Sequence, residues 1–218
     1  MNILAFDTST EACSVALQWN GGVFSDHRVI PRQHNQFILS MIQQLLTDAG
    51  ITLRQLDAIV VGIGPGSFVG VRLAVSVAQG LAYGVDLPLI GVSSLQVLAQ
   101  TAYRERGCPE VVIALDAHMR AFYLGYYRLD KGVMDSQQAE QAILLDVPYQ
   151  LPIVPAATAI GNAWSIYALP TDLPLISDLL PNAIDALRLA QMKNALSAEQ
   201  VVPIYLREAS LWQKVVRS

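Results

Sequence analysis

The sequence predicts an α/β protein with two lobes, in which mixed sheets are flanked by helices. Apolar strands alternate with amphipathic helices along the first half of the chain, which is typical of layered sheets and helices. Two stretches also share one order of features: an apolar strand, an Asp, a short turn and a strand of alternating polarity. These stretches are "ILAFDTSTEACSVALQW" (3–19) and "VIALDAHMRAFYLGYY" (112–127). Two halves that each open with such a hairpin predict two lobes around a cleft.

The first half of the chain is expected to alternate between strands and helices. Apolar and polar residues alternate over 11–19, and "NGG" at 20–22 is a hairpin turn signal. Paired apolar residues recur from Gln33 to Ala49, and Gly50 closes the helix that they predict. The predicted strands are 2–6, 11–19, 23–30, 58–61 and 87–93, and the predicted helices are 33–49, 68–83 and 94–105.

A boundary between the lobes is predicted near "RERGCPE" (104–110). We therefore expect an N-terminal lobe over 1–106 and a smaller C-terminal lobe over 107–218, with the tail after about residue 203 packed back on the first lobe. "DKG" (130–132) predicts another hairpin turn, and most of 133–180 predicts no regular element. The elements expected in this half are strands at 111–117 and 121–129, a strand and turn within 151–164, a helix at 181–196 and an extended segment at 200–208.

Composition indicates a globular protein with a sizeable core and a modest negative charge. Of 218 residues, 53% are hydrophobic and 15% are charged, and the formal net charge is −4. The 14 Lys and Arg residues are scattered, which argues against a stand-alone nucleic-acid-binding protein. Cys13 and Cys108 lie far apart and fit reduced thiols. No signal peptide or transmembrane run is predicted, so we expect a cytoplasmic protein without membrane contact.

The stretch "GIGPGSFVGVRLAVSVAQGLAYG" (62–84) joins a strand to a glycine-rich loop and an apolar helix. Backbone N–H groups at a helix start attract anions, so this order is common in phosphate-binding loops. The loop contains no lysine, which leaves open whether it binds phosphate. The helix after it is apolar nearly all round. That pattern predicts burial on two sides, one against its own sheet and the other against a second helix or a partner.

Several motifs occur in an order and spacing that resemble one family. They are "GIGPGSFVGVRLA", "PLIGVSSL", "IGNAW" and "PIYLR", and with the two hairpins they extend from Met1 to about Arg207. The chain is similar to the TsaB (YeaZ) family, paralogues of TsaD with the two-lobed actin/hexokinase/Hsp70-like (ribonuclease H-like) fold. The resemblance implies a role in forming N6-threonylcarbamoyladenosine on the adenosine beside the anticodon in tRNAs that read codons beginning with A.

The resemblance also implies which partners act with the chain. TsaD carries the active site and TsaE supplies an ATPase, while TsaB is a non-catalytic scaffold that forms a homodimer when TsaD is absent. The chain would contact tRNA only as part of the complex with TsaD and TsaE. Helices 33–49 and 68–83 would form one shared docking surface, because symmetric pairing needs self-complementary apolar faces. The alternative is that both helices cover only their own core. The residues assigned to the interface are Phe37, Ile38, Met41, Leu45, Val71 and Val75.

A vestigial nucleotide site is implied in the same way, with no tightly bound cofactor. Relatives tend to have "DARMGEVY" where this chain has "DAHMRAFY" (116–123), so Arg120 replaces a glycine that would admit a phosphate. Ala163 replaces a second glycine common in relatives, and its methyl group would crowd a ligand. Weak ATP or ADP binding stays open, above all in the complex, and the plain alternative is that these segments are ordinary turns. The residues assigned to this site are Asp7, Thr8, Ser9, Gly64, Gly66, Asp116 and Gly161.

No metal site and no catalytic residue are predicted. TsaD binds its metal with an HxxxH pair, whereas the matching segment here is "GVSSLQVLAQ" (91–100) and no two histidines have that spacing. Ser14, Ser67 and Ser93 have no evident His or Asp partner for nucleophilic catalysis. Two rival functions are a free-standing nucleotide-binding enzyme, such as a small-molecule kinase or hydrolase, and a peptidase. The missing phosphate-site residues weigh against the first, and the missing histidine pair weighs against the second.

Overall fold

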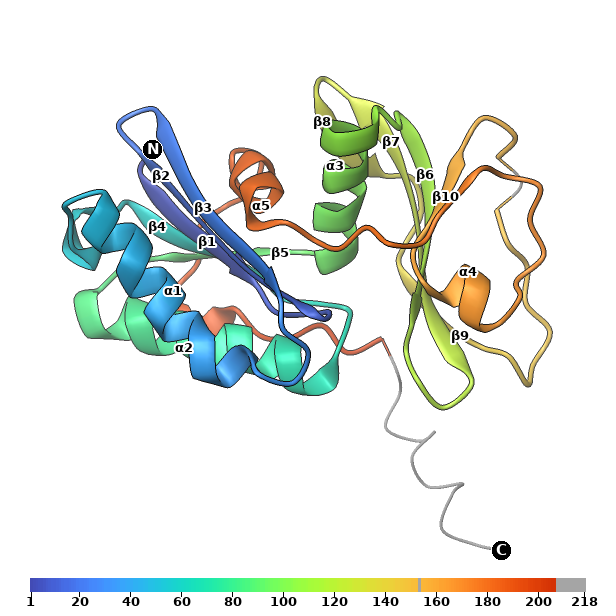
Figure 1. Ribbon diagram of the computed structural model, residues 1–218, viewed down its shortest axis with the longest axis horizontal. Helices are drawn as coiled ribbons and strands as arrows, with labels where there is room; N and C mark the ends of the chain where they lie inside the picture. The colour runs from blue at the N-terminus through green and yellow to red at the C-terminus, as the bar shows by residue number, and fades with distance from the viewer. Residues whose placement is uncertain (153, 207–218) are drawn as a thin grey trace, which may run out of the picture.

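The computed structural model describes residues 1–152 and 154–206, which form two sheets with helices between and around them (Figure 1). The first sheet has the strand order β3-β2-β1-β4-β5. Its first three strands are antiparallel, whereas β4 and β5 run parallel to β1. The strands are β1 (Ile3–Asp7), β2 (Ala12–Trp19), β3 (Gly22–Val29), β4 (Ala58–Gly62) and β5 (Leu89–Val92).

The second sheet repeats the topology of the first. Its strand order is β11-β10-β6-β7-β8, and β9 also pairs with β7. Here β6 is antiparallel to β7 and parallel to β10, as β1 is to β2 and β4. The internal echo in the sequence therefore reflects two halves built on one plan. The strands are β6 (Glu110–Asp116), β7 (Ala121–Asp130), β8 (Val133–Ser136), β9 (Gln141–Leu144), β10 (Thr158–Ile160) and β11 (Leu175–Ile176).

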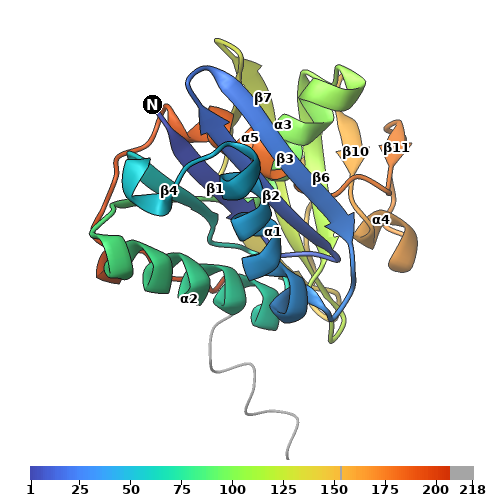
Figure 2. The ribbon, with the colours of Figure 1, turned by 60° about the vertical axis from the view of Figure 1, so that its left-hand side comes forward.

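Helices cover both faces of the first sheet (Figures 1 and 2). Two helices, α1 (His34–Asp48) and α2 (Phe68–Val85), lie on one face, and α5 (Ala183–Ala190) lies on the other. Between α5 and the second sheet stands α3 (Ser94–Arg106), and the short α4 (Ala163–Ile166) packs on β6. Two 3₁₀ turns, Leu53–Gln55 and Ala198–Gln200, complete the described elements. The layers thus alternate between helix and sheet across the molecule.

Strand β1 shows how the first sheet supplies two cores. Successive strand residues point to opposite faces, so Leu4 and Phe6 enter the core under α1 and α2. Ile3 and Ala5 point the other way and pack against α5 residues such as Leu187. Both faces of this strand are therefore covered, which explains why the whole of β1 is apolar up to Asp7.

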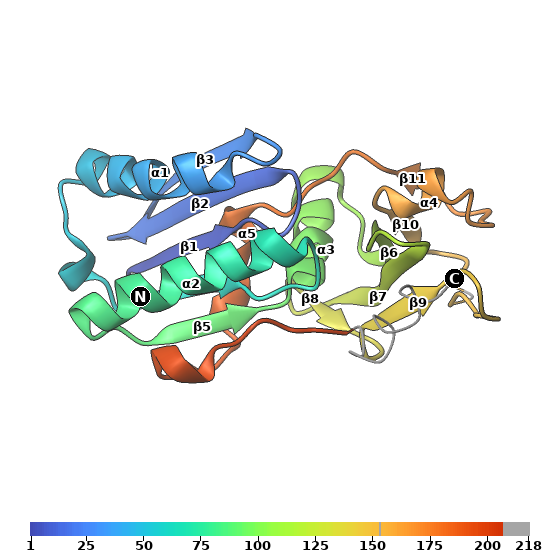
Figure 3. The same cartoon turned by 90° about the horizontal axis from the view of Figure 1, so that it is seen from below.

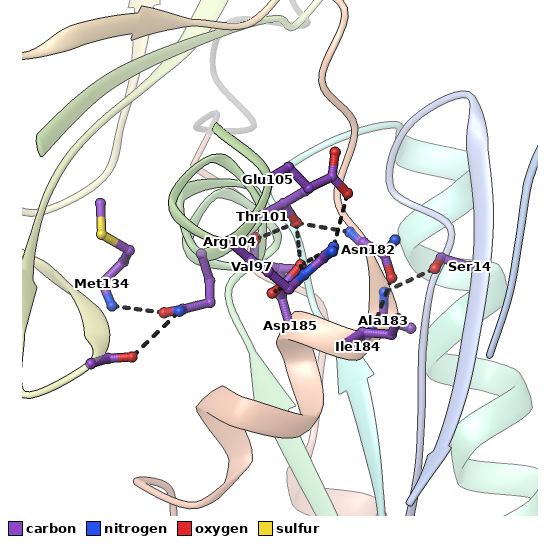
Figure 4. A network of polar contacts seen from close by, with 12 residues as sticks. Ser14, Val97, Thr101, Arg104, Glu105, Met134, Asn182, Ala183, Ile184 and Asp185 are labelled. Carbon is purple, nitrogen blue, oxygen red and sulfur yellow. Dashed lines mark hydrogen bonds and ion pairs between the residues drawn. The ribbon is translucent and has the colours of Figure 1, made fainter. Parts of the chain in front are cut away.

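Helix α5 belongs to the second half of the sequence but packs on the first sheet, and a polar network ties it there (Figure 4). The N–H of Ala183 donates to Ser14 Oγ (2.8 Å). Asp185 accepts hydrogen bonds from Thr101 Oγ1 (2.8 Å) and Arg104 Nε (2.9 Å). Burial raises the pKa of the Asp185 carboxyl, while the hydrogen bonds from Arg104 and Thr101 act in the opposite direction. This network joins α3, α5 and the first sheet.

Most elements predicted in the first half are present, whereas the second half differs in several places. Strands β8, β9 and β11 lie in the stretch for which no element is predicted. The segment "GNAW" begins the short helix α4 instead of forming only a turn. The helix predicted at 181–196 is shorter, Ala183–Ala190, and the residues 191–194 that follow it are exposed. The last two residues of the extended segment predicted at 200–208 lie outside the described residues.

Candidate functional site

The turn after β1 is a buried polar network and not an open loop. Asp7 Oδ1 accepts hydrogen bonds from the backbone N and the Oγ of Ser9 (2.7 and 2.6 Å). Asp7 Oδ2 accepts one from Ser94 Oγ (2.7 Å), which in turn accepts one from the N–H of Gly64 (3.2 Å). Asp7, Ser9 and Ser94 are each at most 2% exposed. Their polar atoms therefore satisfy one another inside the protein.

The glycine-rich loop packs directly against this turn. A Cβ on Gly66 would lie 2.5 Å from the carbonyl oxygen of Ser9, and one on Gly70 would lie 1.9 Å from that of Thr8. The N–H of Ser67 donates to the Ser9 carbonyl (2.7 Å), and Thr8 Oγ1 donates to the Gly70 carbonyl (2.7 Å). Glycine at these two positions thus lets the backbone of the Asp7 turn pack directly against the loop. The predicted site residues that the structure brings together here are Asp7, Thr8, Ser9, Gly64 and Gly66.

The equivalent turn of the second sheet is more open. Asp116, at the end of β6, accepts hydrogen bonds from the N–H of His118 (2.8 Å) and the hydroxyl of Tyr167 (2.6 Å). Its side chain is 13% exposed, and His118 Nδ1 lies 2.9 Å from it. His118, Met119 and Arg120 have φ values of 58°, 49° and 55°, a left-handed conformation that residues other than glycine adopt infrequently. The turn is therefore strained and lies at the surface.

Gly161, assigned to the vestigial nucleotide site, and Arg120, which replaces a glycine of relatives, both have structural explanations. A Cβ on Gly161 would lie 2.4 Å from the carbonyl oxygen of Ala114, and its φ is +106°. Glycine is therefore required there by contact with β6. Arg120 Nε lies 2.8 Å from Asp146 Oδ1, and both side chains are 68% exposed. Asp116 and Gly161 belong to the second sheet, apart from the five residues gathered around Asp7.

The three serines considered as nucleophiles have structural partners. Ser14 Oγ is buried and accepts from the N–H of Ala183 (2.8 Å). Ser67 and Ser93 are the N-caps of α2 and α3, and each accepts from a backbone N–H in the first turn of its helix. Ser93 also donates to Glu140, which accepts a second hydrogen bond from the Tyr127 hydroxyl. Burial and the nearby Glu140 carboxylate raise the pKa of Tyr127 well above its usual range. None of these arrangements is a nucleophile–histidine pair.

Five of the six residues assigned to a partner interface lie in the chain's own core. They are between 1% and 5% exposed. Four of them pack with β1, β2 and β4, whereas Val71 is buried beside Gly64 in the loop after β4, and Phe37 is half-buried against the same core as the four. In this structure the five buried side chains therefore face the interior of the chain and not an exposed surface. Periodicity identifies the apolar stripe of a helix, and on α1 that stripe is the side that faces the sheet. The buried five are Ile38, Met41, Leu45, Val71 and Val75.

The opposite side of α2 is exposed and apolar. Only 33% of the residues of α2 are buried, although it is the one helix within residues 1–152 and 154–206 long and apolar enough to cross a membrane by length and composition. Val69 and Tyr83 are 74% and 81% exposed, and a Cβ on Gly80 or Gly84 would meet nothing within 4 Å. At 100° per residue these positions lie on one side of the helix. We call this set the α2 face: Phe68, Val69, Leu73, Ser76, Gly80, Tyr83 and Gly84.

The sequence predicts an extended segment at 200–208 and a tail that packs back on the first lobe after about residue 203. In the structure, residues 201–206 lie as a strap along the first lobe. We call these residues the C-terminal strap; it runs below the first sheet towards β9 (red in Figure 3). The N–H of Ile204 donates to the carbonyl of Ile63 (2.8 Å), and Gln79 Nε2 donates to the carbonyl of Val201 (3.0 Å). The strap therefore lies between α2 and the loop after β4.

An aromatic and cationic stack holds the end of the strap. The guanidinium carbon of Arg72 lies 3.6 Å from the centre of the Phe68 ring, and Arg72 Nε donates to the hydroxyl of Tyr205 (2.7 Å). The two rings are 6.0 Å apart. A cation placed over an aromatic ring gains electrostatic stabilisation. Phe68 and Arg72 are four residues apart on α2, but no local pattern in the sequence indicates the contact with Tyr205, which lies 133 residues from Arg72.

The architecture matches known proteins in sequence and in structure. Residues 17–174 match the TsaD family model, described as tRNA N6-adenosine threonylcarbamoyltransferase. The chain is 38% identical to the tRNA threonylcarbamoyladenosine biosynthesis protein TsaB of Escherichia coli (strain K12), over 99% of this chain and 98% of that protein. Its identity to TsaB of Haemophilus influenzae is also 38%, over 99% and 97% of the two chains.

A solved structure agrees with these relatives. YeaZ from Pseudomonas aeruginosa superposes with a TM-score of 0.87 and 43% identity, over 94% of this chain and 99% of that chain. The two mixed sheets and their helices fit the predicted actin/hexokinase/Hsp70-like fold. Similarity of this extent covers both lobes, the glycine-rich loop and α2 alike. The chain therefore belongs to the TsaB (YeaZ) family of tRNA threonylcarbamoyladenosine biosynthesis proteins.

Proposed function

We propose that this protein is the non-catalytic scaffold partner of a TsaD homologue, acting with a TsaE homologue in N6-threonylcarbamoyladenosine formation. The observation that carries the proposal is the α2 face, an apolar surface on a helix whose other side fills the core. Contiguous exposed apolar surface is typical of protein–protein interfaces. When TsaD is absent, the same surface pairs two copies of the chain. The proposed location is the cytoplasm, without membrane contact.

The shape of the α2 face suits a helix from a partner. The space beside Gly80 and Gly84 is open, so another backbone can approach α2 closely there. Phe68 and Tyr83 lie near the two ends of the helix and are 50% and 81% exposed. Aromatic side chains are frequent among the residues that dominate binding energy. Leu39 of α1, 55% exposed, adds apolar surface on the same side of the sheet.

The Asp7 turn supports the non-catalytic part of the proposal. A phosphate-binding loop needs backbone N–H groups that are free to reach the ligand. Here the N–H groups of Ser9, Gly64 and Ser67 already donate within the protein. We therefore propose that no cofactor is tightly bound and that ATP or ADP binding is at most weak in the isolated chain. With a net charge of −4, the chain meets tRNA only through the complex.

Replacing Val69 by Glu tests the interface directly. Val69 is 74% exposed, so Val69→Glu is expected to leave the circular dichroism spectrum and melting temperature unchanged. A charge buried unpaired in an interface costs about 3 kcal/mol or more, which corresponds to about a 100-fold loss of affinity for the TsaD homologue and for a second copy. The matched control is Val29→Glu on β3, 58% exposed on the far edge of the first sheet, which should bind normally.

A buried position on the same helix separates loss of binding from loss of folding. Val75 is 3% exposed in the core, so Val75→Glu is expected to lower stability sharply and reduce soluble yield. Binding is measured by titration calorimetry with the TsaD homologue, and function by tRNA modification with the TsaD and TsaE homologues. If folded Val69→Glu protein binds and supports modification as the unmodified chain does, the α2 face is not the interface. If the unmodified chain neither binds TsaD nor increases modification, the scaffold function is wrong.

A further inference from the structure

A groove of about 610 Å³ follows β9 at the edge of the second sheet. All four residues of β9 line it. Successive residues of a strand point to opposite faces, so a groove touched by four consecutive residues runs along the edge of the strand and not over one face. The backbone of β9 is therefore accessible from this groove. Its remaining walls are Val147, Pro148, Tyr149, Gln150 and Leu206.

One edge of β9 has no partner strand among the residues that the structure describes. The other edge pairs with β7, from Ala121 opposite Leu144 to Leu124 opposite Gln141. An open strand edge presents backbone donors and acceptors that an extended chain can satisfy. Apolar contacts are available beside it, because Val147 is 49% exposed and Tyr149 is fixed by an edge-to-face contact with Phe122 (5.6 Å).

The C-terminal strap leads into this groove. Ile204 is held by Ile63 and Tyr205 by Arg72, and the next residue, Leu206, forms part of the groove wall. Twelve residues follow, "REASLWQKVVRS" (207–218). A strand rises about 3.3 Å per residue, so four of them match the length of β9. Because the segment starts at the groove, its effective concentration there is on the order of millimolar, and a weak contact is enough to hold it.

We propose that residues 207–218 bind this groove and pair with the open edge of β9 as an added strand. The segment carries apolar side chains that suit the walls formed by Val147 and Tyr149: Leu211, Trp212, Val215 and Val216. Backbone hydrogen bonds to β9 supply affinity, and the contacts of these side chains with the groove walls determine which tail residues pair with which residues of β9. The C-terminus then connects both lobes, with its strap on the first and its end on the second. The proposal stands independently of the α2 face.

Hydrogen exchange measured by mass spectrometry on the isolated protein tests this pairing. The unmodified chain is compared with one that ends at Leu206. Alternate N–H groups of β9 point to opposite edges; that of Leu145 donates to the Arg120 carbonyl on the β7 side, so those of Ala142 and Leu144 point to the open edge. We expect the amides of Ala142 and Leu144 to exchange at least about tenfold faster in the shortened chain, because their protecting partner is gone. The amides of β8, which lie at the other end of β7, are the internal control and should exchange at the same rate in both. Equal exchange of Ala142 and Leu144 in the two chains overturns the proposal.

Two full-length variants show whether the protection of β9 depends on the apolar side chains of the tail or only on the presence of the tail. Replacing the four apolar tail residues by Ser is expected to remove the protection of the two amides at the open edge, whereas replacing Arg207, Lys214 and Arg217 by Gln should preserve it. The experiment is repeated at several protein concentrations and with the TsaD homologue added. Protection that rises with concentration means that a second copy supplies the strand, and protection seen only with the TsaD homologue means that the partner orders it. Either result overturns binding within one chain.

Discussion

The two halves of the molecule share a sheet topology but differ in the helix that follows the inner parallel strand. In the first half β4 leads into α2, which has 18 residues. In the second half β10 leads into α4, which has four residues and buries Ala163 and Trp164. Among the residues that the structure describes, only the first half therefore presents a long helix with an exposed apolar side. The shared topology therefore accounts for the fold, while the α2 face is a feature of the first lobe.

The turns that carry Asp7 and Asp116 also differ between the two halves, because the first is buried and the second lies at the surface. Asp7 and Asp116 end the equivalent strands β1 and β6, and each accepts a hydrogen bond from the N–H two residues later. Asp7 is 1% exposed and also binds Ser94 on α3. Asp116 stays at the surface, beside a turn with three left-handed residues. The Asp7 turn is therefore part of the core, whereas the Asp116 turn is an exposed hairpin end.

Removing each carboxylate in turn is the strongest test of this difference. Asp7→Ala leaves the buried N–H of Ser9 and two buried hydroxyl groups without their acceptor, so the free energy of unfolding should fall by about 3 kcal/mol. Asp116→Ala affects groups that water can reach, and the loss should be about 1 kcal/mol. Urea denaturation followed by circular dichroism gives both values. Equal losses would show that the two turns are energetically alike.

A third carboxylate extends the comparison to the junction between α3 and α5. Burial raises the pKa of Asp185 above its ordinary value of 3.8, so the folded protein holds this proton more tightly than the unfolded chain. The contribution of Asp185 to stability is therefore full below pH 3.8 and is lost as the pH rises through the raised pKa. Relative to Asp185→Asn, the unmodified protein should lose stability as the pH increases across this window. Unfolding curves for both proteins at a series of pH values give the free energy of unfolding of the unmodified protein minus that of Asp185→Asn. If this value rises with pH, the assignment is wrong.

The smallest expected effect concerns nucleotide binding. The first turn is closed by its own hydrogen bonds, and the second carries Arg120 where relatives tend to have glycine, so we propose that neither turn offers an open phosphate site. Calorimetric titration of the isolated chain with ATP and magnesium should show no binding tighter than about 100 µM, roughly −5.5 kcal/mol. A low-micromolar constant would mean that the turns reorganise around the ligand, and it would revive the nucleotide-binding enzyme as an alternative.

Local patterns predicted the first lobe well because its elements are long and strongly periodic. The helix expected at 33–49 is present as His34–Asp48, and the hairpin signalled by "NGG" joins β2 to β3. Strands β8, β9 and β11 have two to four residues, too few for an alternating pattern to stand out. Tertiary pairing, which a local pattern does not contain, forms these short strands.

The site was harder to predict than the fold. The motifs located the Asp7 turn and the glycine-rich loop, but they could not show that Ser9 and Ser94 already satisfy the carboxylate. Periodicity marked apolar residues on α1 and α2 without showing which of them face the sheet. On α2 nearly every position is apolar, so the outward side became clear only from the exposure of Val69 and Tyr83. The stack of Arg72 with Phe68 and Tyr205 depends on contacts across most of the chain.

The position of α5 has a consequence for the synthesis of the protein on the ribosome. Ile3, Ala5 and Val60 of the first sheet are covered by Ala183, Ala186 and Leu187, and the edge of β5 is bridged by Leu196. These covering residues are translated long after the strands themselves. During most of elongation the nascent first lobe therefore has one apolar face bare, which is a hazard for aggregation. Contacts so distant in sequence also slow folding. The N-terminal lobe is thus completed only after nearly the whole chain has been made.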